Sequence, residues 1–288
     1  MAILTACAEG NKKSEKTDKN EDKKESPKAE KKNSNLFEIE GKVFSIPSPI
    51  QTAFLLKDVG TDYQSDLLNP ANKSGSYTTT YDKALALGIY GADLGYATIF
   101  DQTQDAISYM AVSKKMAGDL GITGVFDDKM IKRFEENLGN QDSLLVLVSD
   151  GFKTTDRYLK NNKQNDLSVL ILAGGWIETL HFATSLAQSS QNEMIKNRIG
   201  EQKITIKNLV NLLAPYTENA KVAEVANQLN ELKDIYAEIE FNYTFKEPTT
   251  NPETKRTIIN SESNVVMSAE QLKNISAKIS SIREGIIN

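Results

Sequence analysis

Residues 85–102 read LALGIYGADLGYATIFDQ, and residues 171–188 read ILAGGWIETLHFATSLAQ. The two stretches align at a constant offset of 86 residues. They are identical or similar at Tyr96/Phe182, Ala97/Ala183, Thr98/Thr184, Phe100/Leu186 and Gln102/Gln188, and in the same register Gly88 meets Gly174, Tyr90 meets Trp176 and Leu94 meets Leu180. We therefore predict a duplicated four-helix unit. Chance similarity between two amphipathic helices is the alternative.

Apolar residues recur every three or four positions from residue 82 to residue 241, which predicts a succession of amphipathic helices. The first repeat, residues 82–161, is expected to hold helices over 82–100, 102–117, 127–137 and 141–160. The second repeat, residues 166–241, is expected to hold helices over 166–188, 191–199, 204–213 and 218–241. The predicted fold class is an all-α helical bundle, with short extended or β segments near both ends and a C-terminal helix.

Punctuating residues agree with these helix boundaries. Candidate N-caps are Asp127, Asn140, Asp166 and Thr217, and candidate breaks are Gly121, Gly139 and Pro215. Within the first helix, Gly88, Gly91 and Gly95 share one face. Each glycine costs about 1 kcal/mol relative to alanine inside a helix, so we expect this face to let another helix approach closely rather than to form a ligand groove.

The flanking segments differ from the central helices. Residues 36–81 contain several prolines and polar runs, which predict extended segments or a short strand, with a short helix around Tyr63–Leu68. Residues 242–288 predict a loop, a small hairpin and a last helix. Ser268 and Gln271 fit a capping box at the start of that helix, and Ile275, Ile279 and Ile282 form a stripe that should dock on the bundle.

The search for catalytic chemistry gives one lead. Common nucleotide-binding and hydrolase motifs are absent, and one cysteine and one histidine exclude the common zinc motifs. Glu178 and His181 form a Glu-x-x-His pair, the spacing found in di-metal helical bundles. That site needs a second pair, whereas the equivalent positions hold Ala92 and Gly95. We predict no catalytic residue, metal or cofactor and a packed, hydrogen-bonded His181, with a metal site as the alternative.

A ligand site between the two repeats is a further hypothesis. Aromatic residues stand at matching positions of the repeats, and polar residues stand near them. The candidate ligand-binding residues are Tyr90, Asp93, Tyr96, Trp176, Glu178, His181 and Gln188. Aromatic residues on helices more often belong to the core, and that interpretation remains open beside the ligand cleft.

Composition excludes two functional classes. The net charge is −5 and the isoelectric point is about 5.2, without a nucleic-acid-binding motif or a basic stripe beyond the first 35 residues. We therefore expect no nucleic-acid partner. No stretch approaches about 18 uninterrupted apolar residues, so no membrane-spanning helix is expected.

The N-terminus resembles that of a bacterial lipoprotein. Leu4-Thr5-Ala6-Cys7 fits a lipobox, in which signal peptidase cleaves before the cysteine and the cysteine is lipidated. Residues 1–6 would then be the remnant of a signal peptide, and Cys7 the lipid attachment site. Because residues 1–4 lack a full basic and apolar region, we expect that the start site was assigned too far downstream or that the chain was shortened. An incidental cysteine is the alternative.

The segment after Cys7 is highly charged. Between Gly10 and Asn35 there are nine lysines and six acidic residues. Such a composition buries too little apolar surface to offset chain entropy. We therefore expect residues 7–35 to form a lipidated, disordered tether, with a solvated tail of no membrane role as the alternative.

The whole chain resembles uncharacterised helical lipoproteins of Bacteroidota-type bacteria. The resemblance rests on the lipobox, the charged tether and the stretches IPSPIQTAFLLKDVG, ALALGIYGADLGYATIFDQTQDAISY and AGGWIETLHFATSLA. It implies a lipid-anchored protein of the bacterial cell envelope and no particular activity. We expect a non-enzymatic binding or scaffold module whose partner is an envelope protein or a small molecule. The alternatives are a sensor-like solute-binding bundle with its ligand between the repeats, and a metalloprotein using Glu178 and His181.

Overall fold

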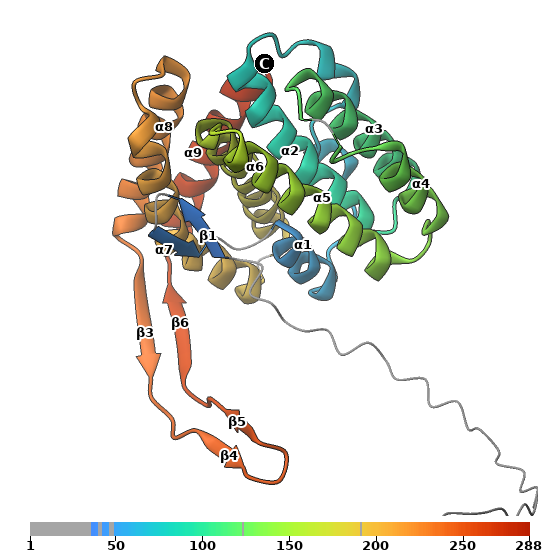
Figure 1. Cartoon of the computed structure of the whole chain (residues 1–288). Helices are drawn as coiled ribbons and strands as arrows, with labels where there is room; N and C mark the ends of the chain where they lie inside the picture. The colour runs from blue at the N-terminus through green and yellow to red at the C-terminus, as the bar shows by residue number, and fades with distance from the viewer. Residues whose placement is uncertain (1–35, 40–41, 46–48, 123, 191) are drawn as a thin grey trace, which may run out of the picture. The chain divides into compact units, whose positions relative to one another are not determined.

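The computed structural model describes residues 36–39, 42–45 and 49–288, except 123 and 191. The candidate signal-peptide remnant, Cys7 and the charged tether lie outside the described residues. The remainder of the chain is an all-α bundle with short strands (Figure 1).

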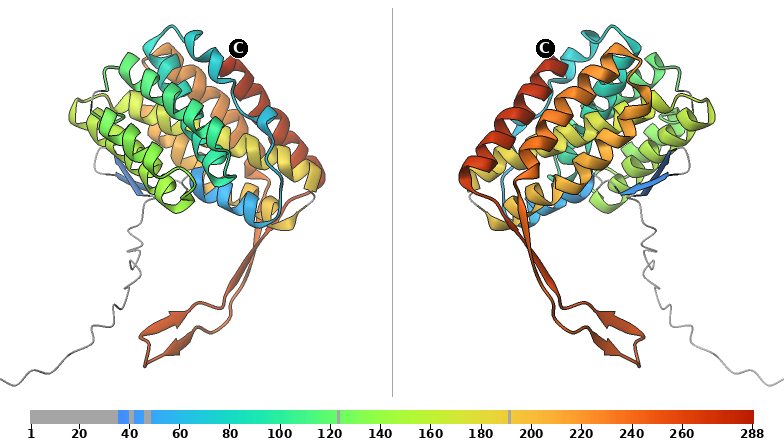
Figure 2. Two further views of the ribbon diagram at one scale, coloured as in Figure 1. Left: turned by 90° about the vertical axis from the view of Figure 1, so that its right-hand side faces the viewer. Right: turned by 90° about the vertical axis from the view of Figure 1, so that its left-hand side faces the viewer.

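Two helices form the centre of the bundle: α2 (Thr80–Ile99) and α6 (Asn165–Ser190). They pack on each other along their length, with α3 (Thr103–Asp119) and α5 (Gln141–Asn161) against α2. On the other side, α7 (Glu193–Leu213) and α9 (Ala269–Ile287) pack against α6. Around this centre lie α1 (Pro49–Asp58), α4 (Asp128–Glu136) and α8 (Ala220–Ala237) (Figures 1 and 2).

Three short 3-10 turns and three two-stranded ribbons complete the described chain. The turns are η1 (Ser65–Leu67), η2 (Ala71–Gly75) and η3 (Ala214–Tyr216). Antiparallel β1 (Leu36–Ile39) and β2 (Lys42–Ser45) form the first ribbon. The other two, β3 (Glu240–Thr244) with β6 (Glu262–Val266) and β4 (Thr249–Asn251) with β5 (Arg256–Ile258), form one hairpin arm between α8 and α9.

The predicted glycine face does not meet a single helix: Gly88 lies at the α2–α6 contact, a Cβ atom on Gly91 would meet the ring of Phe152 on α5, and one on Gly95 would meet Ile50 on α1. At Gly88 the approach of the other helix is as close as predicted. A Cβ atom on Gly88 would lie 2.0 Å from the carbonyl oxygen of Ile171, and one on Gly174 would lie 2.1 Å from that of Leu85. These two contacts are reciprocal, because Gly174 and Ile171 stand 86 residues after Gly88 and Leu85. Backbone therefore meets backbone, and only glycine fits at either position.

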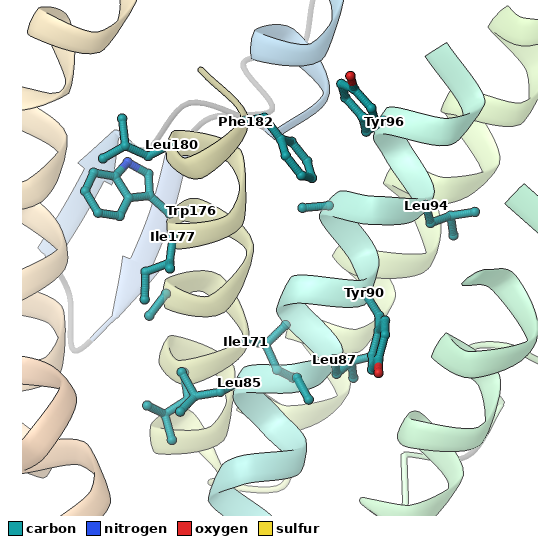
Figure 3. Close-up of a cluster of buried hydrophobic side chains, with 14 of the residues drawn as sticks. Leu85, Leu87, Tyr90, Leu94, Tyr96, Ile171, Trp176, Ile177, Leu180 and Phe182 are labelled. Carbon is teal, nitrogen blue, oxygen red and sulfur yellow. The ribbon is translucent and has the colours of Figure 1, made fainter. Parts of the chain in front are cut away.

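The central helices run parallel and in register at the predicted offset. The rings of Tyr96 and Phe182, which the alignment pairs, contact each other in a tilted arrangement with centroids 4.7 Å apart. Figure 3 shows these two rings facing each other, whereas Tyr90 and Trp176, also paired by the alignment, point to opposite outer sides. This arrangement is what a local two-fold relation between two parallel helices produces. It supports the duplication for α2 and α6, while superposition of the complete units stays a prediction.

The second unit differs from the predicted four helices. Residues 191–199 and 204–213 were expected to be separate helices, but α7 runs unbroken through Gly200. Gly200 is a packing position: a Cβ atom there would lie 2.2 Å from Cγ1 of Val265 in β6. The helix expected over 218–241 also ends early, because α8 stops at Ala237 and the chain enters β3 at Glu240.

Other local predictions have mixed outcomes. Asp127 and Asn140 are N-caps, Gly121 and Gly139 adopt positive φ at breaks, and the Ser268–Gln271 capping box is formed. Asp166 instead lies in the first turn of α6, and Asn219 rather than Thr217 caps α8. Residues 49–58 were expected to be extended but form α1, which begins at Pro49, because proline is favoured in the first turn of a helix.

One helix bears on the expected absence of membrane spans. By length and composition alone, residues 165–188 of α6 are sufficiently apolar to cross a bilayer. However, 89% of that apolar window is buried inside the bundle. This burial is the behaviour of a core helix.

Candidate functional site

The core contains a buried ion pair between α6 and α9. Nε and Nη2 of Arg283 donate to the two carboxylate oxygens of Glu178, at 2.5 and 2.6 Å, and Nη2 also donates to the carbonyl of Leu67 at 2.8 Å. Glu178 is fully buried, and Arg283 is 7% exposed. Arg283 reaches this position because it follows Ile279 by one turn, on the stripe with which α9 docks on the bundle.

A second carboxyl group lies beside this pair. Asp93 on α2 is fully buried near Glu178, Arg283 and the backbone N–H of Asn69, but neither of its carboxyl oxygens has a hydrogen-bond partner among the described residues. Burial raises the pKa of Asp93 well above its usual value, the negative charge of Glu178 raises it further, and Arg283 opposes the rise. Both burial and the charge of Glu178 favour the protonated form of Asp93. Burial also raises the pKa of Glu178, and the hydrogen bonds from Arg283 counteract that rise.

Asp93, Glu178 and Arg283 form a charge cluster. Polar groups of the segment before α2, together with Tyr90 of α2, lie beside it. Nδ2 of Asn69 donates to the hydroxyl of Tyr77 at 2.8 Å, and the hydroxyl of Tyr90 donates to the carbonyl of Pro70 at 3.1 Å. Asn69, Tyr77 and Tyr90 are all buried. The cluster thus joins α2, α6, α9 and this segment, and acts as an internal clamp.

His181 lies one turn after Glu178 in α6. Burial lowers the pKa of His181 to about 3, and the positive charge of Arg283 contributes to the shift, so the imidazole is neutral at physiological pH. The prediction that His181 is hydrogen-bonded is wrong for one of its two ring nitrogens. Nδ1 is buried without a hydrogen-bond partner among the described residues.

The metal hypothesis meets a physical obstacle at Glu178. Asp93 does supply a second carboxyl group nearby, but both oxygens of Glu178 already accept hydrogen bonds from Arg283. A guanidinium group at this position competes with any cation for the same lone pairs. Within the described ranges, no three His, Cys, Asp or Glu side chains are grouped so as to hold a metal ion.

The seven residues predicted to bind a ligand do not line one cleft. Trp176 and Tyr90 point to opposite sides of the α2–α6 pair (Figure 3). Nε1 of Trp176 donates to Oε1 of Gln202 on α7 at 3.0 Å, and Nε2 of Gln188 donates to Ser276 on α9 at 2.6 Å. Tyr96 is buried against Phe182. The predicted cleft between the repeats is occupied by the helix contact itself.

A small cavity lies elsewhere, between α1, α6 and α7. Its volume is about 10 Å³, and Trp176, Thr179, Arg198 and Gln202 contribute to its lining. That volume holds about one water molecule. Trp176 is the one predicted ligand-binding residue that borders it, and the cavity is too small for an organic solute.

The chain matches no family model, no curated protein and no solved structure. Its function must therefore be inferred from its own geometry.

The hairpin arm, unlike the charge cluster, places hydrophobic side chains in contact with solvent. Every residue of β3, β4 and β5 is exposed. Of the nine exposed large hydrophobic residues in the described chain, six lie on the arm: Phe241, Tyr243, Phe245, Ile258, Ile259 and Val266. Phe241, Tyr243 and Phe245 alternate with polar residues, so they share one face of the strand. The arm extends beyond the helices in Figures 1 and 2.

The root of the arm is held firmly. Val265 packs on the bare backbone of Gly200, and Nζ of Lys203 donates to the carbonyls of Ala237 and Ile239 at 2.9 and 2.6 Å. Nε2 of Gln271 donates to the carbonyl of Glu238 at 3.1 Å. Helices α7 and α9 therefore fix the direction in which the arm leaves the bundle.

The ion pair and the aromatic face of the arm were not predicted, although the sequence contains partial signals for both. The stripe of α9 was recognised, but Arg283 was not included, although it stands one turn after Ile279. A small hairpin was predicted within residues 242–267, and the arm confirms it. The alternation at Phe241, Tyr243 and Phe245 was available in the sequence but was masked by assigning Phe241 to a helix.

Proposed function

We propose that this protein is a lipid-anchored, non-enzymatic binding module of a bacterial cell envelope, and that the hairpin arm contacts its protein partner. The observation that carries the proposal is the row of exposed Phe241, Tyr243 and Phe245 on a firmly rooted ribbon. Exposed aromatic residues surrounded by polar ones are typical of interaction surfaces.

The arm favours a protein partner over a lipid bilayer. Its turn, residues 251–256, reads Asn-Pro-Glu-Thr-Lys-Arg and is exposed. Inserting the arm tip-first into a membrane would bury charged Glu253, Lys255 and Arg256 before any apolar residue. The apolar side chains lie between the root of the arm and its charged tip, where a protein surface can cover them while the tip stays in water.

The charge cluster supports a non-enzymatic role. Asp93 and Glu178 have the unusual proton affinity expected of catalytic groups, but they are fully buried and Glu178 is committed to Arg283. A substrate would have to displace that ion pair to reach them. A structural role, joining the helices that carry these residues, is sufficient to explain the cluster.

The anchor is tested by labelling cells with a palmitate analogue. With a complete signal peptide supplied, the native chain should incorporate label and sediment with membranes, and Cys7→Ser should do neither. Equal labelling of both proteins would contradict the anchor.

The binding surface is tested by placing a photo-reactive amino acid at Thr244 in β3. The control position is Ile204 on α7, which is 65% exposed. We expect a discrete protein adduct from position 244 that is absent from position 204 and disappears when Phe241 and Phe245 are both changed to serine. The same adducts from both positions, or adducts with lipid alone, would contradict the proposed role of the arm.

A further inference from the structure

The segment Glu240–Lys246 has a self-complementary sequence. It reads Glu-Phe-Asn-Tyr-Thr-Phe-Lys, with Tyr243 at its centre. When a second copy is laid antiparallel and centred on Tyr243, Tyr243 faces its own counterpart and Phe241 faces Phe245. On the opposite face, Glu240 meets Lys246 and Asn242 meets Thr244. Aromatic pairs and opposite charges directly across two antiparallel strands are favourable.

The edge needed for this pairing is available. Within the described part of the chain, β3 pairs only with β6, so its other edge has no strand partner. Open edges usually carry lysine, proline or a bulge that prevents pairing. The strand Glu240–Thr244 contains neither lysine nor proline, and the one lysine of the proposed segment, Lys246, stands at its end, opposite Glu240 of the second copy. Tyr243 is 65% exposed and Phe245 is 68% exposed, so these side chains are accessible to a second copy.

We propose that two copies of this chain pair through the outer edges of β3, antiparallel and centred on Tyr243, to make a four-stranded sheet from two arms. This inference rests on the proposed role of the arm and names the partner as a second copy. The charge pattern favours a copy over a foreign strand, because every side chain from Glu240 to Lys246 finds a matching one on the same segment. In such a two-fold pairing both copies use the same surface, so the assembly stops at two copies.

The size of the contact sets the expected strength. Stable interfaces bury about 1,200–2,000 Å², and a pairing of seven residues from each copy is smaller. We therefore expect a weak dimer for the free chain. Anchoring both copies to one membrane would raise their effective concentration and favour pairing. Lys246 forms an ion pair with Glu262 on β6 of its own arm, so the lysine must exchange or share that partner to meet Glu240 of a second copy.

Single-cysteine crosslinking tests the register. The full chain carries Cys7→Ser, so that an introduced cysteine is its only thiol. Tyr243→Cys places two thiols opposite each other on the two-fold axis, where Cα atoms of antiparallel strands lie about 4.5–5.5 Å apart, which suits a disulfide. The control is Ser263→Cys, because Ser263 lies directly across from Tyr243 on β6 of the same arm. We expect disulfide dimers from Tyr243→Cys to form at least about tenfold faster.

A charge reversal tests the predicted ion pairs. In the Tyr243→Cys background, Glu240→Lys would place like charges opposite Lys246 and should slow crosslinking several-fold. Glu253→Lys makes the same charge change at the arm tip, outside the pairing, and should leave the rate unchanged. Equal rates for Tyr243→Cys and Ser263→Cys, or equal effects of Glu240→Lys and Glu253→Lys, would overturn the self-pairing. A protein other than a second copy captured from position 244, together with such equal rates, would overturn self-pairing while leaving the proposed binding role intact.

Discussion

The charge cluster and the hairpin arm both depart from the usual pattern of apolar residues inside and charged residues outside, in opposite directions. The cluster places three ionisable groups inside the bundle, and the arm places aromatic side chains in water. Within the cluster, Arg283 compensates the charge of Glu178, and burial raises the pKa of Asp93, whose two oxygens have no hydrogen-bond partner among the described residues. The arm has no comparable cover within the described residues. A buried charge such as Glu178 does not indicate an external ligand, because Arg283 already pairs with it. Exposed aromatic side chains on the arm do indicate an external partner, because no described segment covers them.

Breaking the ion pair should have the largest effect on stability. Arg283→Met leaves the carboxylate of Glu178 buried without its counter-charge, which costs about 3–5 kcal/mol. For a chain of this size that corresponds to a fall in melting temperature of roughly 6–20 °C. Arg256→Met, on the exposed β5, is the control and should change the melting temperature little.

The double variant Glu178→Leu/Arg283→Met sharpens this prediction. With both charges replaced by apolar groups, most of the lost stability should return, because a buried ion pair contributes little net free energy relative to apolar packing. A melting temperature for Arg283→Met within about 1 °C of the wild type would show that Glu178 reaches water and that the clamp is not closed.

The glycine contact between the central helices should give the next largest effect. Gly88→Ala and Gly174→Ala each push a methyl group into a carbonyl about 2 Å away, and overpacking of this kind costs about 1–3 kcal/mol or more. Because the two contacts are reciprocal, the two losses should be similar. Gly285→Ala is the control, since its nearest neighbour would be 4.0 Å away. Urea unfolding of the three variants checks this, and a tolerated alanine at either central position would contradict the close contact.

The fold was largely predictable because its helices follow local patterns. The apolar period and the glycine face of α2 predicted its contact with another helix, and the 86-residue offset identified α6. The errors arose where a local signal had a tertiary cause. Gly200 suggested a break, but its missing side chain makes space for Val265. No glycine or proline marks the end of α8, so the change from helical to alternating pattern at Glu240 was missed.

The site was less predictable because its parts come from distant segments. Asp93 and Glu178 were selected as polar residues near a cleft, and the charge that explains Glu178 stands more than 100 residues later, at Arg283. A sequence pattern does not show that an arginine beside an apolar stripe points inward. To predict the exposed aromatic face of the arm, one would have to know that Tyr243 stays exposed among the segments that the structure describes.

Replacing the buried acid should have a smaller effect that depends on pH. The raised pKa means that folded Asp93 keeps a proton that the unfolded chain releases above about pH 4. The free energy of unfolding of the wild type therefore falls as pH rises from that value towards the folded pKa. Asp93→Asn does not ionise, so its stability advantage over the wild type should grow with pH across this range.

Chemical unfolding at several pH values measures this difference. The groups that face Asp93 are Glu178, Arg283, Tyr77, Tyr90 and Tyr109, together with the backbone N–H of Asn69. Asp62→Asn, at an exposed position, serves as the control and should show no such growth. A variant less stable than the wild type at pH 8 would mean that Asp93 is ionised and contributes to the ion pair.

The smallest effect on stability is expected on the arm. Tyr243→Ser removes an aromatic side chain that is 65% exposed, so the free energy of unfolding should change by no more than about 0.5 kcal/mol. The same change removes the central aromatic pair of the proposed dimer, so association at high protein concentration should weaken while the monomer melts normally. Sedimentation and thermal unfolding of the same samples compare the two quantities. A large loss of stability in dilute monomer would show that Tyr243 belongs to the fold, and the contrast between cluster and arm would then no longer separate structure from recognition.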